Sequence, residues 1–335
     1  MKKERIFSMD LVRVCALALI ILYHFNGLLE MRGGVRLQIP FISQDSMGPI
    51  GVGLYLQISG AALTYNYNGN VIQFYKKRVK ALMVPFYIAY VMVLFFNFIV
   101  GVKPADIPIW KYIYTLLGMD GFLSYRTSTF YLIGEWFLGL IVICYIFFPL
   151  YNVCVKKIPW TFLTGVGITF LYNITVYQYK IPMLWNPLIL TPYFVLGIYF
   201  MEYIYQHIHA EIFFAALLGV YACYCSIFAN MNDILVGTFL LFIVIFMLGK
   251  FVEKSRVRRV VEVLSKYSYG IILFHHVVIN RLFEYLGYGW VADGRKYIVL
   301  FIVCIISFGL AVLLSKIEKI IWKVFFFTKI KIKGQ

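Results

Sequence analysis

Charged residues are scarce in this chain of 335 residues: together they make up 14% of it, and only 15 residues are acidic. Soluble globular domains carry about a quarter charged residues. Hydrophobic residues, by contrast, make up 62% of the chain and aromatic residues 19%. This composition excludes an ordinary soluble domain and indicates a polytopic, all-α membrane protein.

Motifs for metal, nucleotide and hydrolase chemistry are also lacking. The sequence contains no hydrolase elbow, P-loop, HExxH motif or dinucleotide fingerprint. Its six cysteines are scattered, mostly inside apolar runs, and no pair has the spacing of metal ligands. We therefore expect no metal cofactor, and we interpret the cysteines as small packing residues.

The net charge of +16 raises the question of nucleic-acid binding. The basic residues lie in short runs between apolar segments, which is typical of loops that face anionic lipid rather than of a basic groove. We therefore expect membrane lipids, and not nucleic acid, as partners.

Long apolar runs predict about ten membrane-spanning helices, since a span needs roughly 20 residues. The loops between them are short, and no internal repeat is visible. We expect one membrane domain over residues 1–315, followed by a basic amphipathic tail over 316–335 on the inner leaflet. The predicted spans are 7–29, 48–66, 81–102, 131–152, 160–176, 183–204, 211–229, 233–250, 266–286 and 296–315.

The basic residues also predict the orientation. With the N-terminus inside the cell, about two thirds of the 31 lysine and arginine residues fall in cytoplasmic segments. Both termini are therefore expected in the cytoplasm, which agrees with an even number of spans. Arg13 interrupts the first apolar run and no small-residue cleavage site follows it, so we expect a retained span rather than a signal peptide.

The first span carries three ionisable residues, Asp10, Arg13 and His24. Such groups are costly at membrane depth and often mark a functional site. Arg13 and His24 are eleven residues apart, which is three helical turns plus about 20°, or roughly 16 Å along the axis. Asp10 lies one turn before Arg13 on the same face and can pair with it. A histidine here can bond a neighbouring polar group or take a proton from a substrate hydroxyl.

Three further groups are candidates for a site. Arg78 and Lys80 lie at the inner end of the third span, where they either mark an ordinary positive-inside boundary or bind phosphates of a cytoplasmic ligand. Adjacent His275 and His276 lie in the ninth span, and periodicity does not choose between them. Glu135 begins the fourth span, as an interfacial acid or as a partner for a histidine or arginine.

These residues resemble the motifs of the integral-membrane acyltransferase-3 family, which includes bacterial O-acetyltransferases of surface polysaccharides. The first span matches the family's Asp-x-x-Arg, ten residues, then His. Four more segments resemble family motifs in the same order, and the last selects His275 over His276. They are ISGAAL at 58–63, RVKALMVPFY at 78–87, EWFLGL at 135–140 and SYGIILFH at 268–275.

The resemblance implies transfer of an acyl group, usually acetyl from acetyl-CoA, to a carbohydrate hydroxyl at the outer face of a bacterial cell membrane. His24 would be the catalytic histidine and Arg13 its essential companion. Arg78 and Lys80 would bind the coenzyme A donor, with Asp10, Glu135 and His275 in supporting roles.

Two positions depart from the family pattern. Lys80 stands where a second arginine is common, which keeps the charge but loses the bidentate fork. Ile272 stands where a tyrosine is frequent, so a hydroxyl there is not essential in this chain. The alternative function is an exporter of a lipid-linked or small glycoside, which would also place polar groups inside a bundle but predicts paired, broken helices in two repeats.

Overall fold

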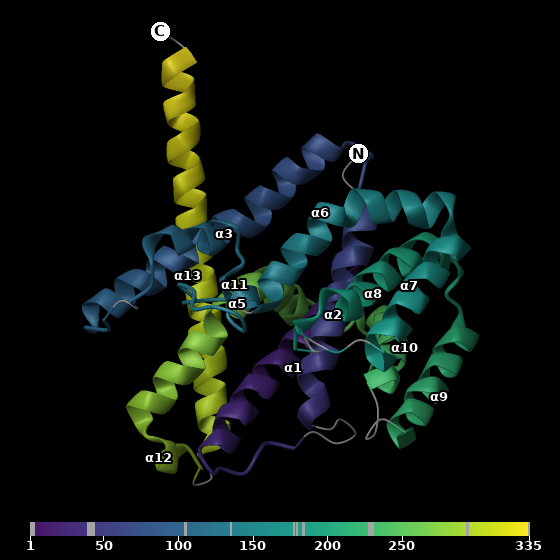
Figure 1. The fold of residues 1–335 in the computed structure, drawn as a ribbon, viewed down its shortest axis with the longest axis horizontal. Helices are drawn as coiled ribbons and strands as arrows, with labels where there is room; N and C mark the ends of the chain where they lie inside the picture. The colour runs from purple at the N-terminus through teal and green to yellow at the C-terminus, as the bar shows by residue number, and fades with distance from the viewer. Residues whose placement is uncertain are drawn as a thin grey trace. The chain divides into compact units, whose positions relative to one another are not determined.

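Every regular element in the described part of the chain is helical (Figure 1). The computed structural model describes residues 4–38, 44–103, 106–134, 136–176, 178, 180–182, 185–226, 231–292 and 295–333. The longer helices are α1 (Phe7–Met31), α2 (Gln44–Asn66), α3 (Val71–Ile99), α6 (Trp136–Lys157), α7 (Pro159–Thr175), α8 (Pro187–Tyr199), α9 (Ala210–Ser226), α10 (Met231–Val252), α11 (Val257–Leu286) and α13 (Lys296–Lys333). A π-helical segment, Phe200–Ile204, continues α8.

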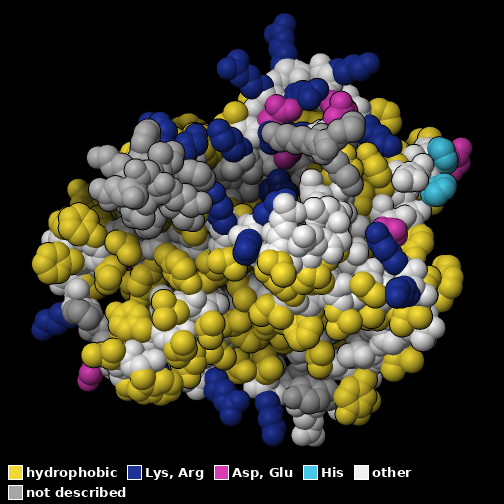
Figure 2. Space-filling model, turned by 90° about the horizontal axis from the view of Figure 1, so that it is seen from above, with side chains coloured by type: hydrophobic (Ala, Val, Ile, Leu, Met, Phe, Trp, Pro, Cys, Tyr) yellow, Lys and Arg dark blue, Asp and Glu magenta, His cyan; other side chains and the backbone are white. Residues whose placement is uncertain are grey.

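Five of these segments are long and apolar enough to cross a membrane: Phe7–Met31, Val71–Ile99, Trp136–Lys157, Pro187–His207 and Lys296–Val324. Hydrophobic side chains cover a broad area of the face drawn in Figure 2. Both observations agree with an all-α membrane protein. The count of ten spans and the cytoplasmic position of both termini stay predictions.

The helices form two compact units, each assembled from separate stretches of sequence. Unit 1 comprises Met1–Val71 and Gly139–Ser265, and unit 2 comprises Ile72–Leu138 and Lys266–Gln335. The single domain expected over residues 1–315 stays a prediction, and each unit contains residues from both halves of that range.

Unit 1 packs α1 against α2 and α10, and α2 against α8. Glycines allow the closest approach. A Cβ atom added to Gly60 of α2 would meet the backbone carbonyl of Phe194, and one added to Gly197 of α8 would meet the carbonyl of Gln57. Small residues at such crossings let membrane helices approach to backbone contact. The glycine of the Ile-Ser-Gly segment therefore serves packing.

Unit 2 contains α3, the segment after it, most of α11, and α13. Tyr269 of α11 donates a hydrogen bond to the carbonyl of Leu82 in α3 (2.8 Å). Gly270 packs against Ala311 of α13, where an added Cβ would lie 2.8 Å from the alanine methyl group. The Ser-Tyr-Gly segment thus joins α11 to its two neighbours within the unit.

The aromatic segment 107–118 forms only short helices, η1 (Ile109–Lys111) and α4 (Tyr112–Leu116), and α5 (Asp120–Leu123) follows it. Lys111 donates to the hydroxyl of Thr127 (2.6 Å) and to the carbonyl of Ser128 (3.0 Å). Tyr112 stacks on Phe130 with 3.9 Å between ring centroids. The segment therefore folds back on residues 127–130 and forms no helix long enough to cross a membrane.

Several helices extend beyond the predicted spans. Helix α3 begins ten residues earlier than the predicted span and includes the basic cluster, and α11 begins at Val257 rather than at residue 266. The predicted tail is continuous with the last span, because α13 runs unbroken through Lys316 to Lys333. A hydropathy window stops at charged residues, whereas a helix continues through them when no proline or glycine interrupts it.

Candidate active site

Three polar side chains meet at the start of α1 in unit 1. Asp10 is buried (3% exposed), and its Oδ1 accepts a hydrogen bond from the hydroxyl of Ser265 (2.6 Å). Arg13 donates from Nη1 to that hydroxyl (2.9 Å) and, over 3.4 Å, to Asp10 Oδ1. We call these residues the Asp10 cluster. The pairing of Asp10 with Arg13 expected from their spacing is present, and Ser265 completes it.

A second arginine binds the same carboxylate from outside the span. Arg5 donates from Nε to Asp10 Oδ2 (2.5 Å) and from Nη2 to the carbonyl of Glu262 (3.1 Å). The hydrogen bond with Asp10 raises the pKa of the Arg5 guanidinium, against the opposing effect of its partial burial. One buried carboxylate is thus held between two cations, which stabilises its charge. Arg5 thus adds a second positive charge beside the Asp10 carboxylate, whose other cation, Arg13, also donates to the Ser265 hydroxyl.

His24 lies on α1 three turns beyond Arg13 and is partly buried. Its ring meets the ring of Tyr23 edge to face, with 5.3 Å between centroids. Two residues further on, the side chain of buried Asn26 bonds both backbone groups of Leu37, accepting from the amide (2.8 Å) and donating to the carbonyl (2.9 Å). These two hydrogen bonds hold the segment after α1 against the end of the helix, close in sequence to His24.

The two predicted donor-binding cations lie near the beginning of α3 in unit 2. Residues two apart on a helix point about 200° apart, so Arg78 and Lys80 do not share a face. Lys80 is exposed, and its ammonium lies 3.7 Å from the centroid of the Trp322 ring on α13. Arg78 is partly buried, 6.0 Å from the centroid of the Phe74 ring. Their role in binding coenzyme A stays a prediction.

His275 is completely buried in α11, and its Nδ1 lies 2.8 Å from the carbonyl oxygen of Ile272. Its ring centroid is 6.3 Å from that of His276, which is partly buried. Glu135 lies outside the described residues. The residue before it, Gly134, donates its amide to the carbonyl of Leu273 (3.3 Å), so the backbone there adjoins α11. The structure therefore gives His275 a buried position on α11.

Two further polar residues carry no functional signal in the sequence. Ser265 carries no signal by itself, because its partners are about 250 residues away in sequence. Asp120 is buried (3% exposed), and burial raises the pKa of its carboxyl to about 6, partly offset by the Thr115 hydroxyl. It is the first residue of the four-residue helix α5, in a segment that hydropathy did not single out. Only the tertiary arrangement identifies either residue.

The two sets of candidates belong to different units: Asp10, Arg13 and His24 to unit 1, and Arg78, Lys80 and His275 to unit 2. In the part of the chain that is described, no group of His, Cys, Asp or Glu side chains has the arrangement of a metal site. A fixed arginine and a histidine on one face of a membrane helix can hold an anionic or carbonyl group and move a proton.

Comparison with known proteins adds one match. The family model of the acyltransferase-3 family, described as an acyltransferase domain, matches residues 6–316, nearly the whole chain. No curated protein and no solved structure matches the chain. The family match covers most of both compact units and every candidate residue. The protein therefore belongs to the acyltransferase-3 family of membrane acyltransferases.

Proposed function

We propose that this membrane acyltransferase transfers an acetyl group from cytoplasmic acetyl-CoA to a hydroxyl of a carbohydrate at the outer face of a bacterial cell membrane. The observation that supports this most is the Asp10 cluster together with His24 on the same helix face. Arg13 is fixed by two hydrogen bonds at the end expected to face the cytoplasm. His24 lies about 16 Å further along the axis, towards the expected acceptor side.

In the proposed reaction, the imidazole of His24 takes the proton of the acceptor hydroxyl. The acceptor oxygen then forms a bond to the acetyl carbon, the thioester carbon–sulfur bond breaks, and the departing thiolate takes up the proton. Transient attachment of the acetyl group to His24 is a second route to the same products. Arg13 would stabilise charge on the donor, since its guanidinium is held in place before the donor arrives.

The donor would enter from the cytoplasmic side with its phosphates near Arg78. Arginine suits this role because its planar fork matches phosphate oxygens. Lys80 would contribute charge without the fork, and its contact with Trp322 fixes the position of its ammonium. An extended pantetheine arm is comparable in length with the distance from Arg13 to His24, so delivery across the membrane is geometrically feasible.

The test is transfer of radiolabelled acetyl from acetyl-CoA to candidate glycans in membranes that contain each variant. Because a general base contributes about 10²- to 10⁴-fold, His24→Ala should lower transfer at least 100-fold without loss of membrane insertion. The matched control is His207→Ala, which removes an exposed histidine of unit 1 whose Nδ1 lies 3.1 Å from the carbonyl oxygen of Tyr203, four residues earlier in the chain. Full transfer by His24→Ala would refute the assignment, and sugar efflux without acetyl transfer by the unaltered protein would favour the exporter.

A further inference from the structure

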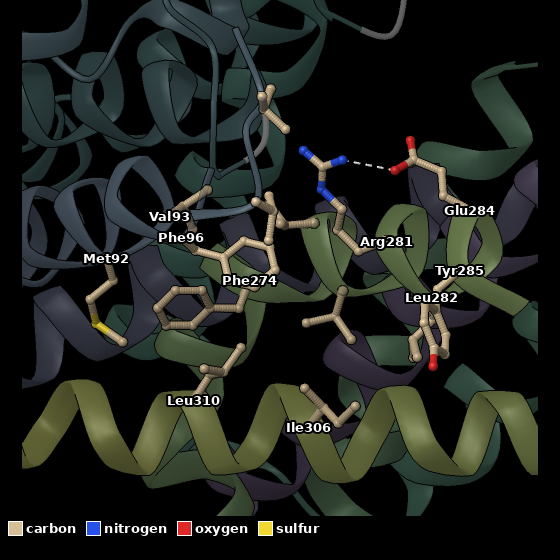
Figure 3. A pocket seen from close by; sticks show the side chains of 14 residues that line it. Met92, Val93, Phe96, Phe274, Arg281, Leu282, Glu284, Tyr285, Ile306 and Leu310 are labelled. Carbon is tan, nitrogen blue, oxygen red and sulfur yellow. Dashed lines mark hydrogen bonds and ion pairs between the residues drawn. The ribbon is translucent and has the colours of Figure 1, made fainter. Parts of the chain in front are cut away.

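An apolar cavity of about 680 Å³ lies within unit 2, between the C-terminal half of α3, the C-terminal half of α11 and the N-terminal half of α13. This volume falls within the range of small-molecule sites. Apart from Arg281, Glu284 and the hydroxyl of Tyr285, its lining is hydrocarbon, aromatic ring or thioether. None of the described candidate active-site residues lines it. Figure 3 shows the cavity from close by, with Phe274 between α3 and α13.

The cavity opens towards a surface that is itself apolar. Phe96 is 45% exposed and Val100 49% exposed on the α3 side, and Tyr285 is 87% exposed on the α11 side. Exposed phenylalanine and valine on a membrane helix face lipid. With the orientation predicted from the basic residues, these ends of α3 and α11 lie in the outer leaflet. A hydrocarbon chain in the membrane therefore has access to this cavity.

The polar mouth consists of one cation beside one anion. Arg281 donates from Nη1 to Glu284 Oε2 (2.8 Å) and from Nη2 to Asn97 Oδ1 (3.1 Å). These two bonds use two of the five guanidinium N–H donors. Both side chains of the pair lie across the cavity from Ile306 and Leu310 of α13 (Figure 3). Arg281 lies five residues before the end of α11, about 8 Å along the axis, so an α11 that ends at the membrane surface would place the guanidinium at the level of the lipid headgroups.

We infer that this cavity binds a zwitterionic glycerophospholipid of the outer leaflet, with one acyl chain between α3, α11 and α13, its phosphate on Arg281 and its ammonium group on Glu284. Charge complementarity selects this ligand. A phosphate bound to the Arg281 guanidinium would displace or repel the Glu284 carboxylate unless the ligand also carried a cation that could pair with that carboxylate. A phosphoethanolamine headgroup carries both charges in adjacent positions, whereas phosphoglycerol carries only the anion. Asn97 keeps the guanidinium at the mouth through its own bond.

The test is native mass spectrometry of the delipidated full-length protein incubated with phosphatidylethanolamine or phosphatidylglycerol of the same chain length. The unaltered protein should retain phosphatidylethanolamine about tenfold better. Arg281→Gln should lower its retention about tenfold. Glu284→Gln should abolish the preference by allowing phosphatidylglycerol to bind equally well. Val277→Phe, which places a ring in the cavity, should lower retention of both lipids.

The matched control is Arg258→Gln, because Arg258 is an exposed arginine on the same helix that donates to a glutamate one turn away, Glu262 (2.8 Å), and is remote from the cavity. This variant should retain phosphatidylethanolamine like the unaltered protein. Circular dichroism and thermal melting identify any variant that fails to fold. If Arg281→Gln or Val277→Phe fails to fold, Glu284→Gln, which removes only an exposed charge, still tests the proposal. Equal retention of both lipids by the unaltered protein, or unchanged selectivity in Glu284→Gln, would overturn the proposal.

Discussion

Replacing Ser265 with alanine should remove both contacts through which its hydroxyl links Asp10 to Arg13. The serine donates to Asp10 over 2.6 Å and accepts from Arg13 over 2.9 Å, and it is itself buried. Hydrogen bonds to charged groups contribute about 1.5–3 kcal/mol each. The side chain of Arg13 is 28% exposed and can recover some hydration, so we expect Ser265→Ala to lower the free energy of unfolding by about 2 kcal/mol.

A double-mutant cycle with Asp10→Asn tests the reasoning more sharply than either single variant. Ser265→Ala removes the hydrogen bond between the two residues, and Asp10→Asn weakens it by removing the charge of the acceptor, so their effects should fall short of additivity by about 1 kcal/mol. The measurement is denaturant-induced unfolding of the detergent-purified protein, followed by circular dichroism. Acetyl transfer by Ser265→Ala should fall about tenfold, because Arg13 loses one of the groups that orient it.

The matched control is Thr164→Ala, whose hydroxyl donates to the carbonyl of Trp160 in its own helix. Its effect on the unfolding free energy should be small, and it should add to that of Asp10→Asn within about 0.5 kcal/mol. Strict additivity of Ser265→Ala with Asp10→Asn would refute the proposed cluster.

Two further predictions concern stability. Burial raises the pKa of Asp120 from an ordinary value of 3.8 to about 6, so the folded state binds this proton more tightly than the unfolded state. The free energy of unfolding should therefore decrease by about 1–2 kcal/mol, allowing for solvent screening, as pH rises from about 4 to 6. Asp120→Asn should remove that decrease, as measured by thermal melts at pH 4 and pH 7. An equal decrease in both proteins would contradict the assignment. Gly60→Ala should destabilise unit 1 by about 3 kcal/mol or more, because its Cβ would meet the Phe194 carbonyl, whereas Gly165→Ala, in open space on α7, should be neutral or stabilising by up to about 1 kcal/mol. Equal melting temperatures for the two glycine variants would contradict the close crossing of α2 and α8.

Hydropathy identified the membrane helices because it measures length and apolarity, and both are local properties of a segment. It was less accurate at helix ends. The basic residues before Val84 in α3 and those before Lys266 in α11 lower the hydropathy, yet they continue the helix. Arg258 and Glu262 even form an ion pair along the face of α11 (2.8 Å).

The site followed a similar pattern. Helical periodicity alone placed Asp10, Arg13 and His24 on one face, because spacing along a single helix fixes which residues are neighbours, and the structure contains the expected Asp10–Arg13 pair. The contacts of Lys80 with Trp322 could not be predicted in this way, since the two residues lie on different helices far apart in sequence. The burial of His275, rather than of His276, depends on how α11 is rotated against its neighbours.

The sequence by itself determined that this is an all-α membrane protein and that its first helix carries a polar face, since composition and periodicity are properties of single segments. Its motifs also indicated the acyltransferase-3 family, which the family match then confirmed. Only the tertiary structure decided that Ser265 completes the Asp10 cluster, that Gly60 and Gly197 bring α2 and α8 into backbone contact, and that α3, α11 and α13 enclose an apolar cavity beside Arg281. Each of these features joins residues from separate helices, so each depends on packing that no single stretch of the chain encodes.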